Sequence, residues 1–171
     1  MAVTNNDLSI FTNKNENGIK LSDRLNTVLT NSKYFDVLVG YFRITGFYLL
    51  KEQLEDVKEI RILIGLGADI ETVRAMDIFE LSGANATRKV QKVITEEFNN
   101  TEDDNLEMEN GVFKFCEWIK SGKLKIRMCY EKNVHAKLYI VRKDPDKVPD
   151  QFGNLITGSS NFTFNGLDKN V

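Results

Sequence analysis

The chain has 171 residues, of which 42% are hydrophobic and 28% are charged, with two cysteines and one histidine. These values are typical of one globular domain and exclude a disordered chain, a collagen and a coiled coil. Two cysteines cannot form a disulfide framework, and no apolar run approaches the ~18 residues of a membrane span. The polar N-terminus does not have the pattern of a signal peptide. We therefore expect a cytoplasmic protein that does not bind membranes.

The net charge is −2, so the chain as a whole has no electrostatic attraction for nucleic acid. The charges are nevertheless unevenly distributed along it. Residues 96–117 hold eight acids against one base, a net of −7, and residues 120–147 hold nine bases against three acids, a net of +6. Such a basic stretch can attract phosphates, but from charge alone a solvated strand-and-turn surface is the better interpretation.

The first part of the chain alternates helix and strand signals. Apolar residues at helical spacing predict helices over residues 19–30, 44–57, 70–81, 86–98 and 110–120. Short runs rich in β-branched residues predict two buried strands, over residues 36–42 and 60–65. A turn at residues 65–67 is expected to end the second strand, and residues 99–105 are expected to form a polar acidic loop. This order predicts parallel strand pairs.

The pattern changes period after residue 122. Residues 123–130 alternate basic with apolar or polar side chains, which predicts a half-exposed strand whose basic face carries Lys123, Lys125 and Arg127. Strands are also predicted over residues 136–141 and 154–157. The polar stretch between them, residues 142–153, holds both prolines and is typical of a hairpin loop. We therefore predict an α/β fold with parallel pairs early and an antiparallel hairpin late.

One set of residues stands out for its chemistry. His135 is the only histidine, and although a lone histidine is usually structural, Lys137 follows two residues later and points to the same face of an extended strand. An otherwise apolar strand rarely places a lysine on its inner face. The next strand ends in Gly158-Ser159-Ser160-Asn161, whose hydroxyl, amide and backbone N–H groups can bind an anion. If the two strands pair, these groups together suit phosphoryl chemistry without a metal.

These residues carry a resemblance to a known family. His135-x-Lys137 followed by Gly158-Ser159-x-Asn161 resembles the HKD motif of the phospholipase D superfamily, and the second half is similar to its single-motif bacterial endonuclease branch. Residues 39–50 and 61–65 resemble the phospholipase D-like domain at the N-terminus of bacterial superfamily 2 (DEAD/DEAH or Swi/Snf type) helicases. The resemblance implies a single domain over residues 1–171, a mixed β-sheet flanked by helices on both faces, within a longer helicase-type protein.

The chain departs from the motif in two places. Arg142 stands where the motif has an aspartate, and Asp144 is the nearest substitute. The spacing from Lys137 to Gly158 is nine residues longer than in the motif, an excess that the loop of residues 142–153 would absorb at the far end of the hairpin.

The resemblance also implies a mechanism that needs no metal or cofactor. One motif histidine attacks phosphorus to form a phosphohistidine, and a second histidine protonates the leaving oxygen and then activates water. His135 would be nucleophile or general acid, Lys137 the phosphate clamp, and Asn161 and Ser159 hydrogen-bond donors. Because the chain has a single histidine, a working site requires a second copy, most simply in a two-fold homodimer.

The substrate expectation is DNA, on the helicase-linked resemblance and the basic strand face. We expect Lys125, Arg127 and Ser160 to contact it. Tyr41 and Phe42 follow the first predicted strand and are candidates for stacking on bases, although core packing is the commoner role of a single aromatic residue.

Three other interpretations compete with this one. A hydrolase built from Ser159, His135 and Asp144 lacks the strand-to-helix elbow that presents a nucleophilic serine. A zinc site from Cys116, Cys129 and His135 has the wrong spacing, and both cysteines fit as small core residues. The alternative of a different class is a catalytically silent DNA-binding or dimerisation module attached to a helicase, which the missing motif aspartate allows.

Overall fold

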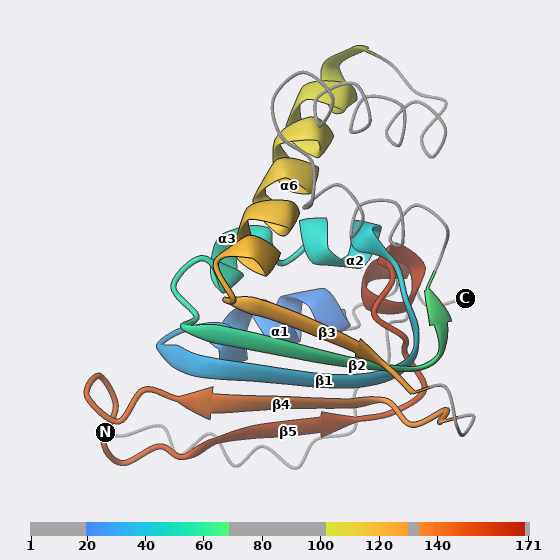
Figure 1. The fold of residues 1–171 in the computed structure, drawn as a ribbon. Coiled ribbons are helices and arrows are strands. Elements are labelled where there is room, and N and C mark those ends of the chain that lie inside the picture. Colours follow the sequence, from blue (N-terminus) through green and yellow to red (C-terminus); the bar gives the residue numbers. More distant parts are fainter. Residues whose placement is uncertain (1–19, 69–101, 130–133, 170–171) are drawn as a thin grey trace.

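The computed structural model describes residues 20–68, 102–129 and 134–169, which form one five-stranded sheet with helices (Figure 1). The strands are β1 (Ser32–Phe42), β2 (Glu59–Ala68), β3 (Leu124–Met128), β4 (Leu138–Lys143) and β5 (Gly153–Thr157). The helices are α1 (Leu21–Leu29), α2 (Ile44–Tyr48), α3 (Lys51–Leu54), α6 (Glu102–Lys120) and a short π-helix, η1 (Asn165–Lys169). None of the described helices is both long and apolar enough to cross a lipid bilayer.

The strand order is β3-β2-β1-β4-β5. β1 pairs in parallel with β2, and β2 with β3, whereas β4 runs antiparallel to β1 and β5 antiparallel to β4. This confirms the predicted α/β class, with parallel pairs early in the chain and an antiparallel hairpin late. The arrangement brings the ends of β1, β2, β3 and β5 and the start of β4 to one edge of the sheet.

The core lies on one face of the sheet. Alternate residues of the central strands are buried there, including Val37 and Val39 on β1 and Ile62 on β2. They form one hydrophobic cluster with residues of α1 and α6, and Figure 1 shows the described helices on this side. The prediction of helices on both faces is therefore not met by the described residues. The physical reason is visible on the other face, where alternate positions hold charged side chains such as Asp36 and Arg61.

Several element boundaries differ from the predictions. β2 continues past the expected turn at residues 65–67, because its last residues still pair with the end of β1. The predicted helix over residues 44–57 is split into α2 and α3, and α6 already includes residues 102–105 of the predicted loop. β4 extends to Lys143, whose ammonium donates to the carbonyls of Val28 and Thr30 at the end of α1. The predicted helices over residues 70–81 and 86–98, and residue 130 of the third predicted strand, lie outside the described residues.

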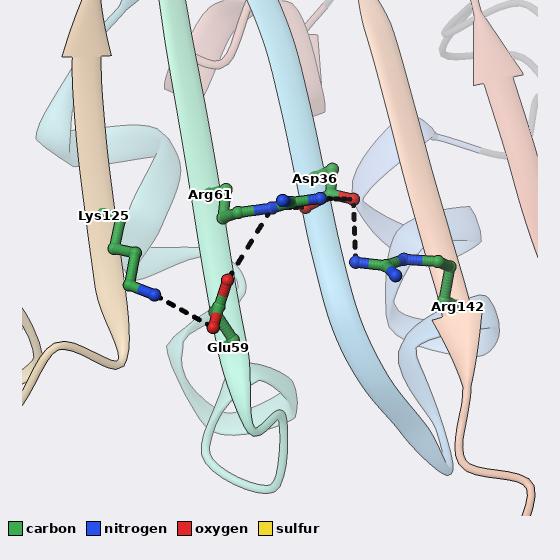
Figure 2. Close-up of polar contacts among 5 residues, drawn as sticks. All are labelled: Asp36, Glu59, Arg61, Lys125 and Arg142. Carbon is green, nitrogen blue, oxygen red and sulfur yellow. Dashed lines mark hydrogen bonds and ion pairs between the residues drawn. The ribbon is translucent and has the colours of Figure 1, made fainter.

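The face opposite the helices, which we call the open face, carries a row of ion pairs across four strands (Figure 2). Asp36 on β1 accepts two hydrogen bonds from Arg61 on β2, at 2.6 and 2.7 Å, and a third from Arg142 on β4, at 3.3 Å. Glu59 on β2 lies 3.8 Å from Arg61 and 3.0 Å from Lys125 on β3. We call these five residues the charge ladder. It ties the parallel strands to the antiparallel hairpin.

Asp36 is the central acceptor of the ladder, and we predict that its contribution to stability depends on pH. Burial raises the pKa of the Asp36 carboxyl, but the hydrogen bonds and charges of Arg61 and Arg142 outweigh burial, so the pKa lies below its usual value. A lowered folded-state pKa stabilises the fold above the unfolded pKa, which is near 3.8, and this contribution is lost as pH falls through the folded value. Asp36→Asn should therefore cost about 1 kcal/mol at neutral pH and progressively less near pH 3.

Urea unfolding of wild type and variant at the two pH values measures this difference. Asp150→Asn, in the exposed hairpin loop, is the matched control and should match wild type throughout. If Asp36→Asn lost the same stability at both pH values, the ion pairs of the Asp36 carboxylate would not be the source of its stabilising effect.

Candidate functional site

The two halves of the predicted motif lie side by side. Leu138 is opposite Thr157 in the β4–β5 register, and the Gly158 N–H donates to the carbonyl of Lys137 at 3.4 Å. Continued in the same register, the residues just before β4 lie beside those just after β5. The two strands pair as expected, so Lys137 lies beside Gly158, and His135 and Asn161 both adjoin Tyr41 at the end of β1. The end of β1 adjoins the same segment, because the Arg43 N–H donates to the carbonyl of Phe162 at 2.9 Å.

His135 is exposed at this edge of the sheet. The ring of Tyr41, at the end of β1, lies edge-on to the imidazole with 6.4 Å between ring centroids and 79° between planes. The Tyr41 side chain is itself 49% exposed. The imidazole is thus accessible to a substrate and has an aromatic ring on one side of it.

Lys137 is buried, with only 5% of its surface exposed. Its ammonium donates to the main-chain carbonyl of His135 at 2.9 Å. Burial lowers the pKa of the Lys137 ammonium from its ordinary value, because the charged form loses hydration. An ammonium has three N–H donors, so two of those of Lys137 are left for other acceptors. The hydrogen bond to the His135 carbonyl holds the ammonium against the main chain of the histidine. The prediction of a lysine on the inner face is confirmed.

The 158–161 segment is held by its own hydrogen bonds. The side-chain oxygen of Asn161 accepts the Tyr41 N–H at 3.0 Å, which leaves both amide N–H groups of Asn161 as donors. The hydroxyl of Tyr139 donates to the carbonyl of Ser160 at 2.7 Å. Burial raises the pKa of the Tyr139 phenol, so this hydroxyl keeps its proton at neutral pH. Ser159 directly precedes these anchored residues and is exposed.

Three glycines allow other segments to approach the site closely. A β-carbon on Gly65 would overlap the carbonyl oxygen of Val134, directly before His135. A β-carbon on Gly166 would overlap the carbonyl of Asn161, and one on Gly46 would lie 2.9 Å from the carbonyl oxygen of Phe162. Sequence reasoning missed these supporting positions and Tyr139. Only tertiary contacts identify them, although glycines beside predicted strands can indicate a close backbone approach.

The remaining predicted substrate residues are not gathered at the site. Phe42 is fully buried and stacks on Phe162 with ring centroids 5.2 Å apart, so it is a core residue and cannot stack on a base. Lys125 belongs to the charge ladder on β3, and Arg127 is exposed on the same strand. Lys123 does not continue their row, because its ammonium lies over the Trp118 ring, 3.7 Å from the centroid.

The structure rules out two of the competing interpretations, which are the hydrolase with Asp144 as its acid and the zinc site that includes Cys116. Asp144 follows β4 at its far end, nine residues and about 30 Å along an extended chain from His135, and pairs there with Lys33. It cannot form a triad with His135, and the motif position itself holds Arg142, which pairs with Asp36. Burial raises the pKa of the Cys116 thiol to about 11, as expected of a core cysteine. Within the described ranges, no cluster of three metal-ligating side chains occurs.

Comparison with known proteins adds no relative: no protein-family model and no curated protein sequence matches this chain. The interpretation of the site accordingly rests on its own residues and geometry.

We predict that Gly65→Ala displaces the segment before β4. The added methyl group overlaps the Val134 carbonyl, so the chain must shift, at a cost of roughly 1–3 kcal/mol. Because His135 is the only histidine, its imidazole proton resonances report the shift directly by NMR. Gly158→Ala is the matched control, since a β-carbon there meets nothing within 4 Å. Unchanged histidine resonances and stability in Gly65→Ala would contradict this role.

Tyr139→Phe removes one hydroxyl and keeps the buried ring. The Ser160 carbonyl then loses its 2.7 Å donor, and we expect a loss of about 1 kcal/mol in the free energy of unfolding. Amide hydrogen exchange should accelerate over residues 158–161 more than over β1. Uniform exchange across the sheet would mean that this hydroxyl does not hold the segment in place.

Proposed function

We propose that the chain is a phospholipase D-like phosphodiesterase that cleaves DNA as a metal-independent endonuclease. The observation that carries this proposal is the convergence of an exposed histidine, a buried lysine and an asparagine amide at one edge of the sheet. His135, Lys137 and Asn161 come from segments that the β4–β5 pairing brings together. Such a set supplies a nucleophile, a fixed cation and neutral donors for a phosphate.

The chemistry follows from these groups. A nitrogen of the His135 imidazole attacks phosphorus, a P–N bond forms, and the P–O bond to the leaving strand breaks. The leaving oxygen takes a proton from a second histidine, which then accepts a proton from water as the water attacks phosphorus and releases His135. Lys137 and the Asn161 amide donate to the non-bridging oxygens, where negative charge accumulates. The exposed Ser159 hydroxyl is a further donor at the same edge.

The second histidine comes from a second copy of the chain. These 171 residues hold one histidine, so we assign the second role to His135 of another copy, and a two-fold axis beside the exposed His135 edge would bring the two imidazoles to one phosphate. As part of the same proposal, the chain is attached to helicase domains in a longer parent protein, which is located in the cytoplasm. This part rests on the resemblance of residues 39–50 and 61–65 alone.

A catalytically silent DNA-binding or dimerisation module is the second candidate. One observation favours it: Arg142, at the position of the motif aspartate, points to the open face and pairs with Asp36 instead of supporting the histidine. Such a module would bind DNA or a second copy without cleaving.

The deciding prediction concerns cleavage without metal. Wild type in EDTA should cleave single- or double-stranded DNA, and His135→Ala should reduce the rate by at least about a thousandfold, because the nucleophile is lost. Acid-labile, base-stable labelling of the protein with ³²P would identify the phosphohistidine. Lys147→Gln, in the hairpin loop, is a control that should leave cleavage unchanged. DNA binding by a folded dimer with no cleavage would favour the silent module.

Mixing wild type with His135→Ala tests the shared site. If each active site needs a histidine from both chains, exchange of subunits with an equal amount of the variant lowers the wild-type activity to about half, since only wild-type pairs cleave. If each chain acts alone, the activity is unchanged by mixing. Sedimentation analysis of the same samples records the oligomeric state.

A further inference from the structure

The open face of the sheet presents cations outward and carboxylates beneath them. In the charge ladder the side chains of Arg61, Lys125 and Arg142 are 52%, 54% and 45% exposed, whereas those of Asp36 and Glu59 are 18% and 29% exposed. Figure 2 shows how the two carboxylates lie between the three cations. The ion pairs thus fix the cations in place, and the outer surface of the row is positive.

A fourth cation and an apolar row lie beside the ladder. Arg127 is exposed on β3, opposite Leu63 in the β2–β3 register. Leu63 aligns with Leu38, and Leu38 with Leu138, so an apolar row crosses three strands between the ladder and the His135 edge. The charged side chains that the described strands place on this face are four cations and two carboxylates, a net of +2 in a chain of net charge −2.

We infer that the open face binds a single-stranded nucleic acid and leads it to the His135 edge. The inference rests on the proposed function for the identity of the site at its end. Phosphates fit the outward cations of the ladder and Arg127, and unpaired bases fit the apolar row, in which Leu63 is 40% exposed and Leu38 and Leu138 are half-buried. A duplex keeps its bases paired inside, so it can use the cations but not the apolar row.

Two further observations support a nucleic acid over a protein partner. The surface adjoins the candidate site, because Tyr41, whose half-exposed ring lies against His135, is near the end of the same strand that carries Asp36 and Leu38. The guanidinium of Arg142 also lies over the Tyr34 ring, 4.3 Å from the centroid, which holds it flat against the sheet. Rigid cations of this kind bind phosphates with little loss of side-chain entropy.

The test measures binding and does not require cleavage. The probe is a fluorescein-labelled oligothymidylate of about 20 nucleotides, and the protein carries His135→Ala so that the probe stays intact. Arg127→Gln and Arg142→Gln should each weaken binding roughly three- to tenfold and lower the slope of log affinity against log salt by about 0.7. Glu59→Gln should strengthen binding, because it removes a negative charge from the row. Lys147→Gln, an equal loss of charge in the hairpin loop, should change neither quantity.

The apolar row has its own matched pair of variants. Leu63→Asn should weaken binding at every salt concentration without changing the salt slope, since it removes base contacts and no charge. Phe152→Asn replaces a residue that is 95% exposed at the hairpin loop and should leave binding unchanged. Circular dichroism melting of each variant identifies any that lose the fold, and Arg127→Gln is the cleanest because Arg127 is outside the ladder.

Several results would overturn the inference. The first is that the protein does not bind oligothymidylate, and the second is that Arg127→Gln and Lys147→Gln change the affinity equally. The others are that Glu59→Gln binds more weakly than its parent protein, and that a duplex of the same length competes more strongly than the single strand. A change of oligomeric state in the Leu63 and Arg127 variants, with nucleic-acid affinity unchanged, would identify the face as a protein interface. Loss of cleavage by His135→Ala tests the proposed function separately, so the two can fail independently.

Discussion

The antiparallel position of β4 between β1 and β5 is the constraint on which the site depends. Because β4 runs opposite to β1, its first residues lie at the edge where the parallel strands end. Because β5 runs opposite to β4, its last residues return to the same edge. A shift of the β4 register by one residue would turn Lys137 and Tyr139 to the open face and bring Ile140 inward. The sheet register therefore positions every group of the candidate site.

β4 also connects the two faces of the sheet. Tyr139 and Val141 point into the core, and Tyr139 holds the Ser160 carbonyl beside the site. Between and after them, Ile140 and Arg142 lie on the open face, where Arg142 joins the charge ladder. In our proposal, a single alternating strand thus supports catalysis on one side and contacts nucleic acid on the other. The position at which the resembled motif has an aspartate holds Arg142, which pairs with Asp36 in the ladder.

Helices and strands were predictable where the spacing of apolar residues within the segment itself has the period of a helix or a strand. The apolar runs of β1 and β2 and the alternation of β3 are strong local signals, and the strands form close to the expected places. The end of β2 was not predictable from Gly65, because that glycine does not end the strand but makes room for Val134. Phe42 was equally ambiguous, since an aromatic residue after a strand can serve a substrate or a core. Burial against Phe115 and Phe162 decides for the core.

The sequence by itself determined the alternation of helices and strands, the late hairpin, and the pairing of a His-x-Lys segment with a Gly-Ser-x-Asn segment. These follow from local periodicity and from the adjacency of strands that a short loop connects. The tertiary structure alone decided which residues meet across the sheet. Asp36 binds Arg61, 25 positions away, and Arg142, 106 positions away, and no local pattern encodes either distance. Such contacts depend on which strands become neighbours, and that is settled only when the whole sheet assembles around its core.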